Sequence, residues 1–180
     1  MSDDEPLPTL PALKSLSRLS ELRPIIVTDT REVTPFIFTR LPSVRGTLIT
    51  GDYGILGAED LFMVERKSLS DMVGCFMGER ERFTREMHRA RGFRFARLLI
   101  IATEDEIEYG AWHSKFTPKA FRSSVSAFES RFIPVVYAPT PEAGAMLVEK
   151  WAWWFARSLV ETCNDLLRGS TPPPAPEKTA

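Results

Sequence analysis

The stretch GDYGILGAEDLFMVERKSLSD, residues 51–71, joins a short apolar run to a group of ionisable side chains. The run 61–64 is typical of a buried strand, and it leads directly into Glu65, Arg66 and Lys67. Asp71 follows four residues after the lysine. Charges at the end of a buried strand are costly unless they pair or bind an ion. The stretch therefore predicts a site at this strand end.

Apolar runs alternate with helical patterns on both sides of this stretch. We expect a hairpin from the strands 47–50 and 61–67, and a poorly patterned connection over 33–46 before it. The expected strands are 25–28, 47–50, 61–67, 96–102 and 134–137. The expected helices are 69–75, an arginine-rich helix ending near 91, a short acidic turn or helix at 104–109, 117–131 and 140–167. This order predicts an α/β fold, with a mixed central sheet of about five strands flanked by helices.

The length and composition suit one globular domain. The chain has 180 residues, of which 43% are hydrophobic, and a net charge of −1. We place the domain at residues 24–168. Residues 1–23 are rich in proline, serine and acid and predict a flexible segment, or a short amphipathic helix that docks elsewhere. Residues 169–180 are proline-rich and predict a disordered tail.

The two cysteines, Cys75 and Cys163, lie far apart and form no CxxC motif, so we expect free thiols in a reducing compartment. No apolar run reaches the ~18 residues that a membrane span requires. We therefore expect a cytoplasmic protein that makes no membrane contact.

Carboxylates recur at the ends of the predicted strands. Asp29, Asp52 and Glu65 each lie at such an end, and Glu65 and Lys67 share one face of their strand while Arg66 points to the other. Converging carboxylates repel each other unless a cation lies between them, and Mg²⁺ or Mn²⁺ with oxygen ligands fills that role. With a lysine beside it, such a cluster suits metal-assisted phosphodiester hydrolysis.

A basic helix is expected directly downstream. Residues 79–97 hold seven arginines and three glutamates, an excess of four positive charges. Arg82, Arg85 and Arg89 are three and four residues apart, so they share one side of a helix. We expect them to contact DNA phosphates; an ordinary solvated helix face is the alternative.

The order Asp52, then Glu65-x-Lys67, has the look of the PD-(D/E)xK nuclease arrangement. Four motifs in order, TDTRE (28–32), GDY (51–53), VERKSLSD (64–71) and GERERF (78–83), closely resemble the XPF-type structure-specific endonuclease domain of that superfamily. The resemblance implies a restriction-endonuclease-like core with a divalent metal ion. It implies metal ligation by Asp52, Glu65, the Arg66 backbone carbonyl and Asp29; catalytic roles for Asp29, Asp52, Glu65, Lys67 and Asp71; and supporting roles for Arg31, Glu32 and Arg66.

The resemblance further implies a DNA endonuclease in which water attacks the phosphodiester directly. The chain resembles the stand-alone bacterial and phage form, without the helix-hairpin-helix module. XPF-type domains pair through this fold, which suggests a homodimer or heterodimer. A non-catalytic DNA-binding subunit and an RNA nuclease are alternatives. Asp71 is also an ordinary helix-capping residue at N3, so both interpretations of it stay open.

Overall fold

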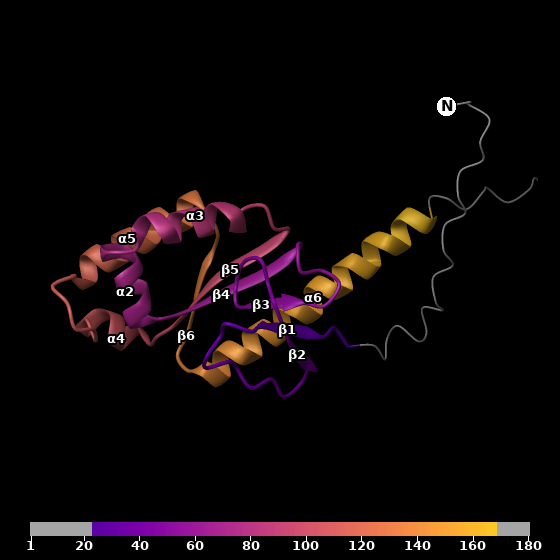
Figure 1. Cartoon of the computed structure of the whole chain (residues 1–180), viewed down its shortest axis with the longest axis horizontal. Helices are drawn as coiled ribbons and strands as arrows, with labels where there is room; N and C mark the ends of the chain where they lie inside the picture. The colour runs from indigo at the N-terminus through magenta and orange to yellow at the C-terminus, as the bar shows by residue number, and fades with distance from the viewer. Residues whose placement is uncertain (1–22, 169–180) are drawn as a thin grey trace, which may run out of the picture.

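The fold is a three-layer α/β arrangement, described here for residues 23–168 of a computed structural model (Figure 1). Its sheet has six strands in the order β2-β1-β3-β4-β5-β6. The strands are β1 (Ile26–Asp29), β2 (Ser43–Gly46), β3 (Tyr53–Ile55), β4 (Phe62–Ser68), β5 (Phe95–Ile101) and β6 (Val135–Ala138). Pairing is antiparallel for β1 with β3 and for β3 with β4, and parallel elsewhere. The predicted mixed sheet is confirmed.

Helices cover both faces of this sheet. One apolar cluster joins α2, α3, α4 and α5 to sheet residues such as Met63 and Leu98, and a second joins α6 to residues such as Val64 and Leu99. Figure 1 shows α6 alone crossing its face of the sheet, with the other helices on the opposite side. The bounds are α2 (Leu69–Met77), α3 (Arg80–Ala90), α4 (Glu104–Tyr109), α5 (Pro118–Arg131) and α6 (Pro141–Arg168).

Side-chain caps explain several helix starts. Ser68 accepts a hydrogen bond from the Asp71 amide at the start of α2, and Thr117 does the same for Ala120 at the start of α5. Thr103 and Glu106 form a reciprocal capping box on α4. These polar residues are visible in the sequence, and those at Ser68 and Thr103 place the starts of α2 and α4 directly after β4 and β5.

Two expectations about the first half of the sheet were wrong. Residues 47–50 form no strand, because the Leu48 amide and carbonyl bond to the side chains of Asp29 and Arg31 instead of a neighbouring strand. The segment 43–46, expected to be part of a connection, is the edge strand β2. The predicted hairpin exists, but its first strand is Tyr53–Ile55.

Predictions for residues 1–22 and 169–180 lie outside the described residues. Between residues 23 and 168, no helix has both the length and the apolar character needed to cross a membrane. Cys75 and Cys163 are both free thiols.

Candidate active site

A cleft of about 350 Å³ opens where β1, β4 and the loop before β3 face α3. It collects most of the side chains that the sequence singled out. The lining residues are Asp29, Arg31, Glu32, Val33, Ile49, Gly51, Asp52, Glu65, Lys67, Arg82, Glu86 and Arg89. Arg66, Asp71 and Arg85 do not line it.

The backbone holds Asp52 from both sides. Its amide donates to the carbonyl of Val64 at 2.9 Å, and its own carbonyl accepts from the Asp29 amide at 2.9 Å. Gly51 precedes it with φ of 85°, and a Cβ there would lie 2.9 Å from Cε of Met63. Glycine therefore suits this position both by conformation and by space. The turn places Asp52 between the ends of β1 and β4.

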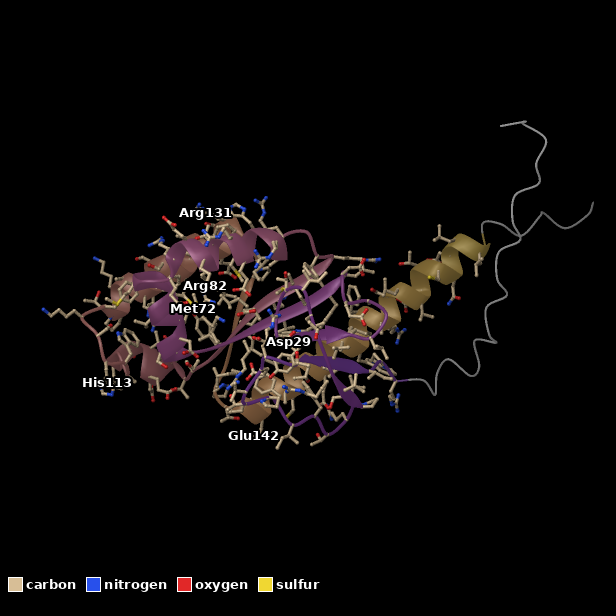
Figure 2. All side chains as sticks on the ribbon, in the orientation of Figure 1. Asp29, Met72, Arg82, His113, Arg131 and Glu142 are labelled. Carbon is tan, nitrogen blue, oxygen red and sulfur yellow. The ribbon has the colours of Figure 1, made fainter. Side chains whose placement is uncertain are left out.

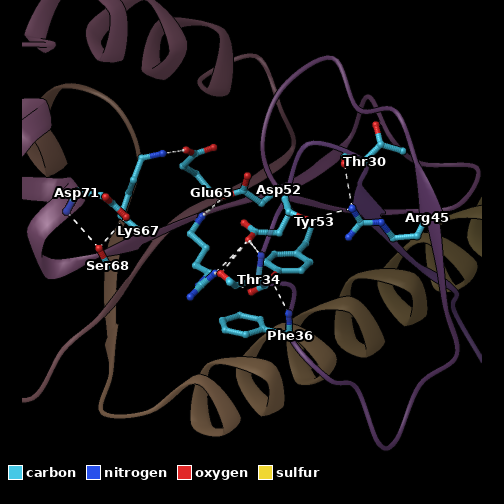
Figure 3. A network of polar contacts seen from close by, with 12 residues as sticks. Thr30, Thr34, Phe36, Arg45, Asp52, Tyr53, Glu65, Lys67, Ser68 and Asp71 are labelled. Atoms are coloured by element: carbon cyan, nitrogen blue, oxygen red, sulfur yellow. Dashed lines mark hydrogen bonds and ion pairs between the residues drawn. The ribbon is translucent and has the colours of Figure 1, made fainter.

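Glu65 and Lys67 extend from β4 into the same cleft, as alternation along a strand requires. Glu65 is only 2% exposed, and its Oε1 accepts a hydrogen bond from Nζ of Lys67. The Asp52 carboxylate is bound from the strand itself, because its Oδ2 accepts from the Arg66 amide at 2.7 Å. Through the Arg66 amide and the Lys67 side chain, β4 thus supplies a hydrogen-bond donor to each of the two acids, Asp52 and Glu65 (Figure 3).

Burial and mutual repulsion disfavour charge on the two acids. Burial raises the pKa of Asp52 to about 6, against the lowering effects of the Arg66 amide and Lys67. Burial, followed by the negative charge of Asp52, raises the pKa of Glu65 to about 8. Burial would lower the pKa of Lys67, but the Glu65 carboxylate outweighs it and raises that pKa. A cation bound between the two acids would relieve their repulsion.

Asp29 organises the neighbouring loops. Its Oδ1 accepts from the amide and Nε of Arg31 at 2.9 and 2.7 Å, and its Oδ2 accepts from the Leu48 amide at 2.7 Å. Arg31 Nη2 also donates to the carbonyl of Leu48 at 2.8 Å. Burial would raise the pKa of Asp29, but these hydrogen bonds outweigh it and lower the pKa to about 2.

Arg66 points to the opposite side of β4 from its two neighbours. Its Nη1 donates to Oε1 of Glu32 at 3.2 Å and to the carbonyl of Thr34 at 2.9 Å, and its guanidinium lies 5.3 Å from the ring centre of Phe36. Figure 3 shows this network beside Asp52. Arg66 and Glu32 therefore tie the loop after β1 to the strand that carries Glu65.

Asp71 forms a helix cap. Oγ of Ser68 accepts from the Asp71 amide at 3.1 Å and donates to Oδ2 of Asp71 at 2.6 Å. The side chain is exposed and does not line the cleft. Figure 3 shows it in contact with Ser68. This geometry accounts for an acid at N3 through capping.

Helix α3 supplies the basic wall of the cleft. Arg82 (labelled in Figure 2) lines it and is ion-paired with Glu79. Nε of Arg89 lies 3.4 Å from Oγ1 of Thr50. Arg85 is exposed away from the lining. Sequence reasoning missed Glu86, which lies between Arg82 and Arg89 on the cleft side and whose negative charge helps raise the pKa of Asp52 and Glu65. Its spacing of four from Arg82 and three from Arg89 was the available signal.

The donor chemistry of the cleft fits Mg²⁺ or Mn²⁺. Within residues 23–168, no three aspartate, glutamate, histidine or cysteine side chains come close enough together to hold a metal ion. Mg²⁺ requires less than that, since proteins commonly hold it with one or two carboxylates while water and substrate phosphate complete its shell. Asp52 and Glu65 supply two carboxylates, the first half-buried and the second buried. Oδ2 of Asp52 accepts from the Arg66 amide, and Oε1 of Glu65 accepts from Lys67.

No protein-family model matches the sequence, and no curated protein matches it. Among solved structures, the chain is similar to XPF from Aeropyrum pernix, with a TM-score of 0.56, 17% identity, and coverage of 71% of this chain and 64% of that one. It is similar to the complex of that XPF with DNA, with a TM-score of 0.57, 16% identity, and coverage of 76% and 66%. The chain thus spans slightly less than two thirds of either XPF chain. At this level of identity the likeness is one of fold, and the chain has an XPF-type nuclease fold.

Proposed function

We propose that the chain is a DNA endonuclease that depends on a divalent metal ion, Mg²⁺ or Mn²⁺. Its substrates would be duplex or branched DNA in repair, recombination, replication or phage DNA processing. The observation that carries the proposal is the convergence of Asp52, Glu65 and Lys67 in one cleft with the arginines of α3. The XPF-type fold supports it.

In this proposal, Asp52 and Glu65 bind the metal ion together with the backbone carbonyl of Arg66, while Arg31, Glu32 and Arg66 hold the loops. The bound metal ion would polarise the scissile phosphate and acidify the attacking water. Asp29 is proposed as an additional ligand. Its Oδ1 already accepts a hydrogen bond from Arg31 and its Oδ2 accepts one from Leu48, so either oxygen would be shared with the metal ion.

Lys67 would position the attacking water or a non-bridging phosphate oxygen. Glu65 raises the pKa of Lys67, so the ammonium group stays protonated. A protonated amine donates hydrogen bonds and stabilises negative charge, and it does not accept a proton. Arg82 and Arg89 would contact flanking phosphates, as would Arg85 if the DNA extends beyond the cleft.

The test is a cleavage panel in Mg²⁺ with duplex, single-stranded, flap, fork and four-way DNA, and with an RNA duplex beside them. Asp52→Asn and Glu65→Gln should each abolish cleavage. Asp60→Asn, which changes an exposed acid in the turn before β4, should leave it intact. Circular dichroism and thermal unfolding would verify that each variant folds. Full activity in both cleft variants would refute the proposal.

A wild-type protein that binds DNA but cuts nothing in Mg²⁺ or Mn²⁺ would favour a non-catalytic subunit. Preferential cleavage of RNA would redirect the substrate class. Both outcomes are read from the same panel.

We also propose that the chain pairs with a second nuclease domain, its own copy or a relative. Part of the apolar face of α6 already covers the sheet. Phe155 is buried in the apolar cluster there, and Leu147, Trp151 and Leu159 are packed against that cluster. Met146 and Trp154 are each 54% exposed and border a cavity of about 800 Å³. Their exposed side chains would contribute to the pairing surface. A strict monomer at micromolar concentration in sedimentation would contradict this.

A further inference from the structure

Two aliphatic side chains in the cleft project into solvent. Val33 is 89% exposed and Ile49 is 91% exposed, and both line the same cleft as Asp52 and Glu65. Exposed aliphatic residues are common one at a time on protein surfaces. Two of them in one polar cleft, from separate loops, offer apolar surface to a ligand bound there.

The backbone around Ile49 is held so that the side chain points outward. Leu48 and Thr50 are buried, with 3% and 4% exposure. The Leu48 amide donates to Asp29 and its carbonyl accepts from Arg31, while Thr50 contacts Arg89. Ile49 thus stands between two anchored neighbours.

Val33 is presented in the same way. The carbonyl of Glu32 accepts from Nη2 of Arg45 at 3.0 Å, and the carbonyl of Thr34 accepts from Nη1 of Arg66 at 2.9 Å. The Thr34 amide also donates to Oε1 of Glu32 at 2.9 Å. Since β-branched side chains have restricted χ1 angles, both projecting groups have few rotamers to lose when a ligand binds.

We infer that Val33 and Ile49 contact unstacked DNA bases next to the scissile phosphate, which rests on the proposed endonuclease function. The arginines of α3, and a metal ion held by Asp52 and Glu65, would fix the phosphodiester in the cleft, and the bases attached to it would meet the two apolar side chains. Aliphatic side chains inserted at a base step unstack it and kink the duplex. The cleft therefore favours DNA whose stacking is weakened at the cut site, such as a mismatch or a junction.

The experiment compares wild type with the double variant Val33→Thr and Ile49→Thr, which keeps branching at Cβ and replaces a methyl or ethyl group by hydroxyl. The matched control is Ile37→Thr, because Ile37 is 84% exposed and lies outside the cleft. Substrates are a fully paired duplex and the same duplex with a central mismatch. Mn²⁺ titration verifies that each variant still binds metal.

We expect the double variant to lose on the order of tenfold in kcat/KM on the paired duplex and much less on the mismatched one, because the mismatch removes most of the unstacking cost. Equal losses on both substrates, no loss, or the same loss in the Ile37→Thr control would overturn the inference.

If the wild-type protein cuts no substrate, the proposed endonuclease function is refuted. That result does not by itself refute the contact of Val33 and Ile49 with DNA bases. Fluorescence of 2-aminopurine placed in a short duplex decides that case. Wild type should raise the fluorescence by unstacking the base, and the double variant should not. A protein that binds the duplex without raising the signal, or that does not bind DNA at all, overturns the inference.

Discussion

Replacing Asp29 by asparagine should destabilise the protein by about 2 kcal/mol at pH 7. The carboxyl group has a pKa of about 2 in the folded protein and an ordinary value of 3.8, and each unit corresponds to about 1.4 kcal/mol. Asparagine keeps the shape of the side chain and loses the charge. It also places an NH₂ group among the donors of Arg31 and Leu48, which now face carboxylate oxygens.

The pH dependence of this loss follows from linkage. Because the folded pKa lies below the unfolded one, Asp29 contributes its full stabilisation at a pH well above 3.8, and loses it as the pH falls toward 2. The deficit of Asp29→Asn relative to wild type should therefore fall to about half by pH 3. Urea unfolding at pH 7, 5 and 3 measures it, with Asp60→Asn as a control that changes an exposed acid.

Two results would refute this reasoning. One is an Asp29→Asn variant with the free energy of unfolding of wild type at pH 7. The other is a deficit that stays the same at pH 3, which would mean that the charge of the carboxylate does not matter.

Three further predictions concern charged groups. The pKa values of Asp52 and Glu65 are raised to about 6 and 8, so protons compete with metal ions for these carboxylates. Mn²⁺ affinity measured by calorimetry should therefore rise steeply between pH 6 and 8. A Mn²⁺ affinity that does not change over this pH range would contradict the prediction. Glu86→Gln removes a negative charge that raises both pKa values, so it should shift that rise to lower pH, and an unshifted curve would exclude such a field effect. Glu149→Ala leaves three backbone amides of residues 39–41 without their acceptor and should cost about 2 to 4 kcal/mol in thermal or urea unfolding, whereas the exposed Glu142→Ala should cost much less.

Much of the fold was predictable because its elements carry local signals. Thr103 and Thr117 cap α4 and α5, and both helices begin at or next to the residue expected from the sequence. The edge strand β2 has no such signal, since Ser43–Gly46 is largely exposed and lacks an apolar pattern. Residues 47–50 have the alternating pattern of a strand, with Leu48 and Thr50 inward and Ile49 outward. The backbone of this segment nevertheless bonds to side chains and not to a neighbouring strand.

The candidate site was predictable where strand ends determine it. Asp29, Asp52 and Glu65 come together because β1, β3 and β4 are neighbours in the sheet. The direction of each helical side chain was less accessible from sequence. The arginine spacing grouped Arg85 with the cleft, while the structure turns Glu86 toward it. A glutamate among arginines on a helix is ordinarily interpreted as part of an ion pair on a solvated surface. The sequence therefore did not predict that Glu86 lies near Asp52 and Glu65.

The Asp29 variant also separates metal ligation, which the sequence predicts for this residue, from the loop-holding role that its hydrogen bonds indicate. If Asp29 binds the metal ion, Asp29→Asn should weaken Mn²⁺ binding along with stability. If it acts by holding Arg31 and Leu48, the variant should keep metal affinity, and it should loosen the segment that presents Ile49. Its cleavage should then decline more on paired than on mismatched duplex, as in the Val33 and Ile49 double variant. Lost metal affinity with unchanged substrate preference would assign Asp29 to the metal and refute the loop-holding role.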